Sequence, residues 1–172
     1  KGDYNGYEYR YCVFNPQGPV EVVDPYAKAS LANGISSVAA RPRPLLGKNK
    51  ETLPPCPSLT KAIIYETHVR DFTSHSSTNI QNKGTYLGLV EPGRKTKNGH
   101  PAGLDYLKML GITHLQLLPI ADYASVKEGH PTLGYNWGYD PAQYFVPEGS
   151  LSSDPEDPFA RVEEVKTMVS TL

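Results

Sequence analysis

The sequence lacks the features that identify several large classes of protein. Its formal net charge is only -1 over 172 residues, so it does not have the basic surface that nucleic-acid binding requires. No apolar run approaches the roughly 18 residues needed to cross a bilayer. The two cysteines, Cys12 and Cys56, are too few for a disulfide framework or a zinc cluster. We therefore expect neither nucleic acid nor a membrane as a partner.

The motifs of several common enzyme classes are also missing. The sequence has no phosphate-binding glycine-rich loop that ends in Lys-Ser or Lys-Thr, no dinucleotide fingerprint after a strand, and no nucleophile elbow. Its five histidines form no pair at the helical i, i+4 spacing. Because such pairs are the usual sequence signal of a metal site, we predict no metal ligands and no cofactor.

What is present is a folded chain that is rich in tyrosine. Hydrophobic residues make up 38% and charged residues 20%, values too apolar for a disordered chain. There are 12 tyrosines against four phenylalanines and one tryptophan, and tyrosine rings with a polar tip suit sugar surfaces. The sequence begins at Lys1 and ends at Leu172 inside an amphipathic pattern. We expect a piece of a larger protein, either cytoplasmic or secreted.

Residues 1–41 carry the pattern of short β-strands. Tyrosines alternate with charged residues between Tyr7 and Tyr11, and a turn sequence at 15–19 leads into a run of valines at 20–23. This pattern predicts a β-hairpin. Five prolines follow within 42–61, too many for a helix or a strand, so this stretch is predicted to be a linker between domains.

Residues 62–172 read as alternating strands and helices. Strands are expected at 62–71 and 112–120, and a polar loop rich in Ser, Asn and Gly should follow the first strand up to about Pro101. A helix is expected at 104–110 before Gly111, and a long loop at 121–156. A second crossover helix should follow Asp157, with an apolar stripe on one face: Phe159, Val162, Val165, Val169 and Leu172. The fold class predicted is α/β, as the first two β/α units of a partial (β/α)8 TIM barrel.

Three polar residues near the end of the first strand form one candidate site. Glu66, His68 and Arg70 share one face of the first strand, because side chains alternate along a strand. They could be catalytic at the rim of a barrel, or they could form an ion-pair network that shapes its mouth. We favour the network, since an arginine lowers the pKa of a neighbouring carboxyl and weakens it as a proton donor.

The densest chemical signal lies in the long loop. Tyr135–Pro141 reads YNWGYDP, and Tyr144 and Val146–Ser150 follow closely. Aromatic rings stack on the CH-rich faces of sugars, while Asn and Asp side chains bind hydroxyl groups. The same composition also suits a surface loop that packs on its own aromatics. The composition supports both interpretations equally.

At this loop the sequence resembles the type I pullulanases of the α-amylase superfamily. The resemblance rests on long motifs in the family order: Asp24–Ala29, Ile63–Phe72, Gly103–Gly111, Tyr135–Pro141 and Val146–Ser150. It implies the end of an immunoglobulin-like, starch-associated β-sandwich at 1–41, before the partial barrel. It also implies hydrolysis of α-1,6-glucosidic bonds with retention.

The resemblance also implies the roles of individual residues. Tyr139 matches the family tyrosine that stacks on the sugar before the scissile bond, and Asp140, Asn136 and Trp137 are implied to lie beside the substrate. The catalytic carboxylates of the family follow later strands, so no catalytic residue is expected here. The implied partners are pullulan or branched dextrins and the remainder of the barrel. A structural calcium stays open for the parent protein, with no site for it in this sequence. The alternatives are an isoamylase, a glycogen-branching enzyme, or a non-catalytic carbohydrate-binding module.

Overall fold

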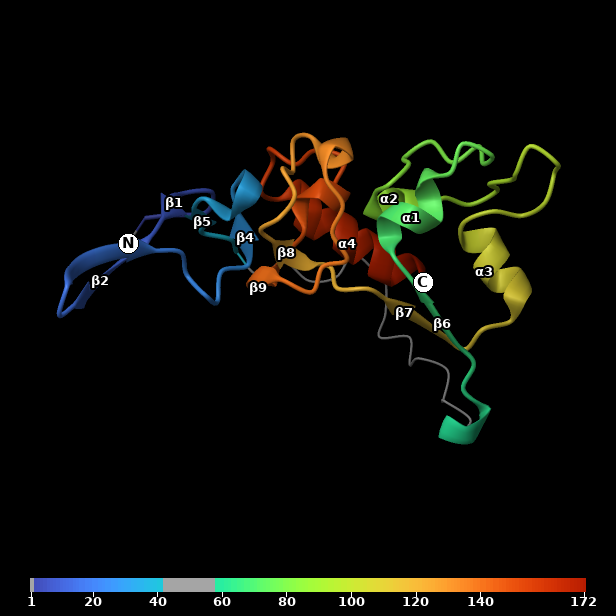
Figure 1. Cartoon of the computed structure of the whole chain (residues 1–172), viewed down its shortest axis with the longest axis horizontal. Helices are drawn as coiled ribbons and strands as arrows, with labels where there is room; N and C mark the ends of the chain where they lie inside the picture. Colours follow the sequence, from blue (N-terminus) through green and yellow to red (C-terminus); the bar gives the residue numbers. More distant parts are fainter. Residues whose placement is uncertain (1, 42–57) are drawn as a thin grey trace. The chain divides into compact units, whose positions relative to one another are not determined.

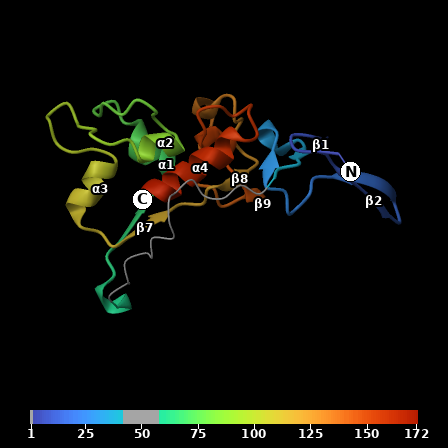
Figure 2. The same ribbon diagram turned by 180° about the vertical axis from the view of Figure 1, so that it is seen from behind.

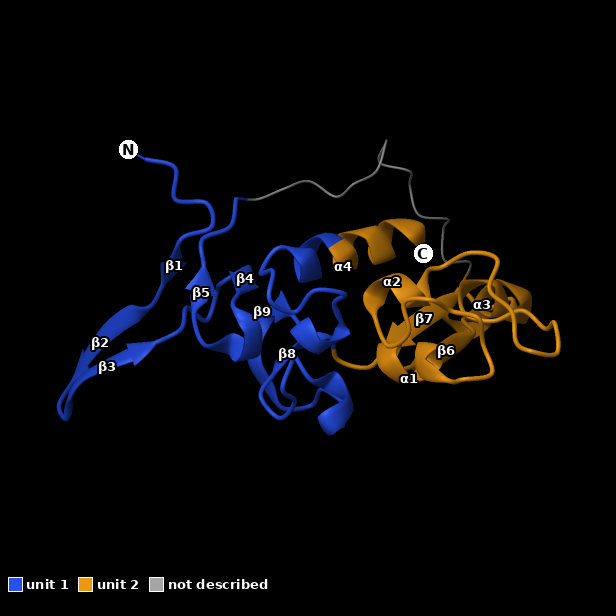
Figure 3. Cartoon of the chain, turned by 90° about the horizontal axis from the view of Figure 1, so that it is seen from above, with its two compact units in different colours: residues 1–44, 120–163 blue, residues 45–119, 164–172 orange. Residues whose placement is uncertain are grey.

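The computed structural model describes residues 2–41 and 58–172, and its path is drawn in Figure 1. The predicted linker at 42–61 lies mostly outside the described residues, as does Cys56. Two compact units are formed, each from two separate stretches of chain (Figure 3): Lys1–Pro44 with Ile120–Glu163 in unit 1, and Leu45–Pro119 with Glu164–Leu172 in unit 2. The domain boundaries expected at 41 and 62 stay predictions.

The first stretch of unit 1 consists of short antiparallel strands. Two of them, β2 (Tyr11–Asn15) and β3 (Gly18–Val22), form a hairpin around Pro16 and Gln17, with Asn15 opposite Gly18. This confirms the hairpin predicted from the alternating pattern. The other three form a small sheet in the order β1-β5-β4: β1 (Glu8–Tyr9), β4 (Ala29–Ser30) and β5 (Ser37–Val38). That these strands end an immunoglobulin-like sandwich stays a prediction.

Unit 2 contains a parallel pair of strands with helices between them. Strand β6 (Ile64–Thr67) pairs in parallel with β7 (His114–Leu117), as the strand-helix-strand pattern predicts. The connection carries three helices: α1 (Val69–Ser74), α2 (Tyr86–Leu89) and α3 (Leu104–Leu110). As predicted, α3 ends at Gly111, whose φ of 65° is a left-handed conformation that glycine adopts without strain.

Two predictions for this connection were wrong. The strand expected at 62–71 ends at Thr67, because His68 caps a helix: its Nδ1 accepts a hydrogen bond from the backbone N–H of Arg70 at 3.0 Å. The polar stretch before Pro101 was predicted to be a loop, but it contains α2, capped by Thr85. Helices this short are stabilised by their caps and by buried contacts. Their sequences are too short to show a helical period, so they are hard to predict from sequence.

The second stretch of unit 1 was predicted to be a long loop and instead contains a β-ribbon. Strands β8 (Ala121–Tyr123) and β9 (Pro141–Pro147) are antiparallel, and they lie side by side in Figure 1 and from behind in Figure 2. Two 3-10 helices, Pro131–Leu133 and Gly149–Leu151, flank β9 in sequence. A three-residue strand and a strand that opens with proline carry little sequence signal.

The last helix, α4 (Ala160–Thr171), exists as predicted, but it buries a different face. Asp157 precedes it and accepts a hydrogen bond from the backbone N–H of Phe159 at 2.8 Å. The buried positions of α4 are Arg161, Glu164 and Met168, whereas Val169 is 52% exposed. The apolar stripe noted in the sequence is therefore not the most buried face of α4. None of the helices in the described ranges has the length and apolarity to cross a membrane.

Gly88 in α2 provides a test of the packing in unit 2. A Cβ atom at Gly88 would lie 1.9 Å from the backbone oxygen of Asn82, so Gly88→Ala must displace backbone. We expect it to lower the free energy of unfolding by about 1–3 kcal/mol, the usual range for overpacking. At Gly129 the added atom would meet nothing closer than 3.5 Å, so Gly129→Ala is the control. Urea denaturation of both variants measures the difference, and equal midpoints would contradict this packing.

Candidate functional site

The loop that carries the aromatic motif is closed at its base by the ribbon of β8 and β9. We call residues 124–140 the aromatic loop, since they connect the end of β8 to the start of β9. Tyr123 pairs with Pro141, and Asp122 pairs with Gln143 in the antiparallel register. The two ends of the aromatic loop are therefore held next to each other. The predicted site residues all lie within this one loop.

Polar side chains fix the tip of the aromatic loop. Asn136 donates from Nδ2 to Oδ1 of Asp140 at 2.6 Å, and its own Oδ1 accepts from the backbone N–H of Gly138 at 2.7 Å. The hydroxyl of Ser125 donates to the other oxygen of Asp140. These hydrogen bonds from Ser125 and Asn136 lower the pKa of Asp140. Gly138 has a φ of 89°, a conformation that strains other residues.

The aromatic rings of the motif are left exposed. Trp137 is 60% and Tyr139 68% exposed, and Tyr135 is 51% exposed. A loop that packed on its own aromatics would cover these rings, whereas here the polar contacts of Asn136 and Asp140 hold the loop. The geometry favours the interpretation in which ring faces are presented to a ligand, with a carboxylate and an amide beside them.

The second candidate site predicted from the sequence is not formed as expected. Glu66, His68 and Arg70 do not share a strand face, since β6 ends at Thr67 and Arg70 lies in α1. Glu66 is exposed and accepts a hydrogen bond from Nε2 of Gln116 at 2.6 Å, while His68 is buried at the helix cap. The predicted shared face is therefore wrong, because the chain turns from β6 into α1 at His68 and side chains no longer alternate there.

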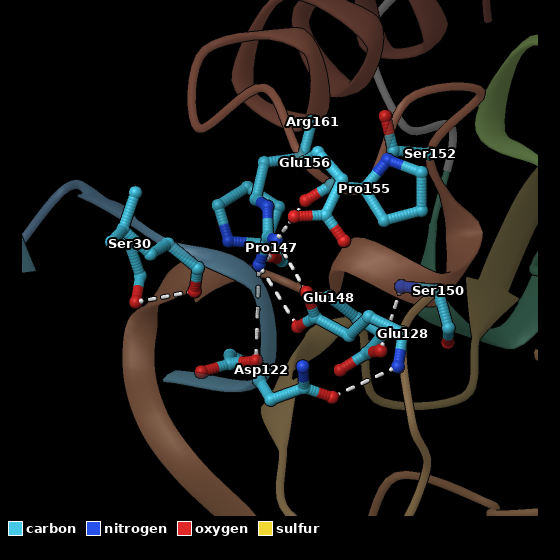
Figure 4. A network of polar contacts seen from close by, with 12 residues as sticks. Ser30, Asp122, Glu128, Pro147, Glu148, Ser150, Ser152, Pro155, Glu156 and Arg161 are labelled. Carbon is cyan, nitrogen blue, oxygen red and sulfur yellow. Dashed lines mark hydrogen bonds and ion pairs between the residues drawn. The ribbon is translucent and has the colours of Figure 1, made fainter. Parts of the chain in front are cut away.

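A buried acidic cluster at the base of the aromatic loop was not predicted from the sequence. It consists of Asp122, Glu128, Glu148 and Arg161, all between 0% and 1% exposed (Figure 4). Arg161 on α4 donates to both oxygens of Glu128, at 3.0 Å from Nη1 and 2.5 Å from Nη2. Only Glu148 falls within a motif noted in the sequence. The other three are charged residues, which usually lie at the surface, and Arg161 follows Glu128 only after 33 residues.

The two remaining carboxyls of the acidic cluster have different surroundings. Glu148 accepts from the backbone N–H groups of Tyr123 at 2.9 Å and Ser150 at 2.8 Å. Asp122 accepts from Nε2 of Gln143 at 3.0 Å. Burial raises the pKa of Glu148. Burial, and next the Glu128 carboxyl beside it, raise the pKa of Asp122 to about 8.

The acidic cluster is not suited to a metal ion, although its carboxyl oxygens lie within 4.8 Å of one another. Both oxygens of Glu128 are bound by Arg161, and those of Glu148 are bound by backbone N–H groups. A guanidinium in the centre of the group also repels a cation. The acidic cluster is built around an arginine and not around a metal ion.

The first stretch of unit 1 packs against the base of the aromatic loop. Tyr26 stacks on Phe145 of β9, with ring centroids 5.7 Å apart, and Nζ of Lys28 lies 4.2 Å from the Phe145 centroid. Gln143 donates to Oγ of Ser30 at 3.0 Å, and Asn33 accepts from the backbone N–H of Glu128 at 3.0 Å. Segments that the sequence assigned to separate domains therefore share one set of contacts.

Comparison with known proteins places these features in context. No family model matches the chain. The pullulanase of Bacillus subtilis (strain 168) is 47% identical over 171 residues, covering 99% of this chain and 24% of that protein. Isoamylase 1 of Oryza sativa subsp. japonica, a chloroplastic protein, is 31% identical over 147 residues, or 77% of this chain and 17% of that protein.

Solved structures give the same result. The pullulanase type I of Bacillus subtilis complexed with maltose matches with a TM-score of 0.89, covering 99% of this chain and 24% of that one. The pullulanase of Paenibacillus barengoltzii in complex with maltohexaose and α-cyclodextrin matches at 46% identity with a TM-score of 0.87, covering 96% and 26%. The chain thus spans about a quarter of the length of these relatives. Identity of 47% along nearly the whole chain, together with the same fold, shows strong homology to the type I pullulanases over about a quarter of their length.

Proposed function

We propose that this chain presents a substrate-binding loop of a starch-debranching glycoside hydrolase that cleaves α-1,6-glucosidic bonds in pullulan or branched dextrins with retention. The observation that carries this proposal is the aromatic loop, in which Tyr139 and Trp137 are exposed while Asn136 and Asp140 hold the backbone. Relatives of the same fold bind maltose and maltohexaose. In this proposal Tyr139 stacks on a glucose ring.

The chemistry of the described carboxyls supports a binding role rather than a catalytic one. Retaining hydrolysis needs a nucleophile and a proton donor about 5 to 5.5 Å apart, both in reach of the sugar. Asp122, Glu128 and Glu148 are buried and bound by protein groups. Asp140 is exposed, but its lowered pKa keeps it ionised at neutral pH, so it is a poor proton donor. We infer that the catalytic pair lies elsewhere in the parent protein.

An isoamylase-type activity is the second candidate. The match to rice isoamylase 1 favours it, because that protein is 31% identical over most of this chain. The comparison of pullulan with amylopectin as substrates of the full-length protein separates the two. Faster cleavage of pullulan supports the pullulanase proposal, and cleavage of amylopectin alone supports the isoamylase.

The chain by itself is expected to be inactive. Because Asp122, Glu128, Glu148 and Asp140 offer no exposed pair of nucleophile and proton donor, the 172-residue chain should release no reducing sugar from pullulan. The measurement is a reducing-sugar assay against a buffer control, with host enzymes removed. Release above that control would place catalytic groups within this sequence.

Tyr139 provides the direct test of the stacking role. In the full-length protein, Tyr139→Ala should lower kcat/KM for pullulan at least about tenfold, since it loses about 0.5–1.5 kcal/mol of stacking as well as the ring burial. Tyr139→Phe keeps the ring face and should retain most of the activity. Tyr4, which is 64% exposed outside the aromatic loop, gives the control Tyr4→Ala. Loss of thermal stability in Tyr139→Ala with unchanged kcat/KM would remove Tyr139 from the site.

Asp140 is expected to act through the shape of the loop as well as by contact. Asp140→Asn places an amide against the donors of Ser125 and Asn136, so the loop tip should loosen. We expect a higher KM for pullulan together with faster hydrogen exchange at the Gly138 amide. Tyr139→Ala should raise KM without changing that exchange. An unchanged Gly138 amide in Asp140→Asn would assign Asp140 to substrate contact alone.

A further inference from the structure

The acidic cluster contains more negative groups than its one arginine can neutralise. Three carboxyls and one guanidinium are buried together, and both Nη atoms of Arg161 donate hydrogen bonds to Glu128 (Figure 4). The same two nitrogens also donate to the backbone oxygens of Pro147 at 3.4 Å and Pro155 at 3.0 Å. If all three carboxyls were ionised, two buried charges would lack a counter-ion. Such charges are strongly disfavoured, and the usual solution is that one group keeps its proton.

Asp122 is the carboxyl with the weakest support for a charge. Its Oδ2 accepts one hydrogen bond from the amide of Gln143, but its Oδ1 accepts none from an N–H group in the described part of the chain. The nearest guanidinium nitrogen, Nη1 of Arg161, lies 3.9 Å away. By contrast, Glu128 holds the guanidinium and Glu148 holds two backbone N–H groups. A neutral Asp122 can instead donate its proton toward Glu128.

Asp122 is surrounded by charged and neutral groups from several elements of unit 1. The titratable or charged ones are Glu128 from the aromatic loop, Glu148 after β9, and Arg161 from α4. The neutral ones are Gln143 from β9, which also bonds Ser30 of β4, and Gly34, where an added Cβ would lie 3.0 Å from Oδ2 of Asp122. Two negative neighbours and one already engaged positive neighbour favour the neutral form.

Asp122 lies at the base of the aromatic loop, so its protonation state affects how this base is packed. Asp122 pairs with Gln143 where β8 and β9 close the base of the aromatic loop. Ionisation would place a third negative charge beside Glu128 and Glu148, at a side chain that is only 1% exposed to solvent. We propose that the proton on Asp122 acts as a latch that keeps the base of the aromatic loop closed, and that its loss as the pH rises lets this base open.

The direction of the pH dependence follows from the two states. In the closed state the pKa of Asp122 is raised to about 8, whereas in an open, solvated state it falls to the ordinary value of about 3.9. The contribution of protonated Asp122 to the stability of the closed state is therefore fully present below about pH 4. It is lost as the pH rises through about 8. Within that window the opening constant should increase by about tenfold per pH unit for this group.

Hydrogen exchange on the full-length protein tests the latch without any substrate. Protection factors for the amides of residues 121–148, corrected for intrinsic exchange, should fall by about tenfold per pH unit between pH 5 and 7. In Asp122→Asn, which keeps an acceptor for Gln143 and can donate to Glu128, this dependence should be largely lost. Glu8→Gln removes an exposed carboxyl in the same unit and should follow the wild-type curve.

Three results would overturn the proposal. Protection in the wild type that is flat between pH 5 and 7 would do so even if Asp122→Asn failed to fold. A variant with the same pH dependence as the wild type would assign the effect to another group. Protection that falls on addition of a chelator would assign the carboxyls to a bound cation instead of a proton. Since no glucan is involved, each result is independent of whether Tyr139 binds substrate.

Discussion

The buried pairing of Arg161 with Glu128 is the interaction on which unit 1 depends. Through its two Nη atoms, one side chain of α4 reaches the aromatic loop at Glu128, the end of β9 at Pro147 and the approach to α4 at Pro155. Removing one partner of such a pair leaves an uncompensated buried charge, which costs about 3–5 kcal/mol. Gly149 shows how closely the pair is packed, because an added Cβ would approach both side chains. The loop is therefore held from its base, and its tip needs no aromatic packing.

Two aspartates show how the same residue type serves opposite ends of the aromatic loop. Asp140 at the tip is exposed and accepts hydrogen bonds from Ser125 and Asn136, which lower its pKa. Asp122 at the base is buried beside Glu128, and its pKa is raised. Environment alone decides the difference, since hydrogen-bond donors favour the charged form and burial disfavours it. A charged, solvated tip suits contact with sugar hydroxyls, whereas a neutral base allows close packing.

Local patterns in the sequence predicted part of this structure correctly. The hairpin of β2 and β3, the parallel pair of β6 and β7, and the end of α3 at Gly111 all follow from period, turn residues and caps. The residues of the aromatic loop were also identifiable, because they are adjacent in sequence. The buried face of α4 was not, since its burial depends on Glu128, which lies 33 residues before Arg161. A charged residue is predicted to be exposed until its distant partner is known.

The contacts of residues 24–34 change how the first stretch of unit 1 is understood. Gln143 needs Ser30 as an acceptor, and the backbone N–H of Glu128 needs the side chain of Asn33. Asn33 reaches it from a left-handed conformation, with φ at 59°, which asparagine tolerates better than most residues. Without this segment, buried donors of Gln143 and Glu128 would lose their acceptors, at about 1–3 kcal/mol for each buried group. The same loss would open the base of the aromatic loop to water and remove the low-dielectric surroundings that keep Asp122 neutral. The early segment is thus a structural part of the proposed substrate-binding region, although about 100 residues of sequence separate the two.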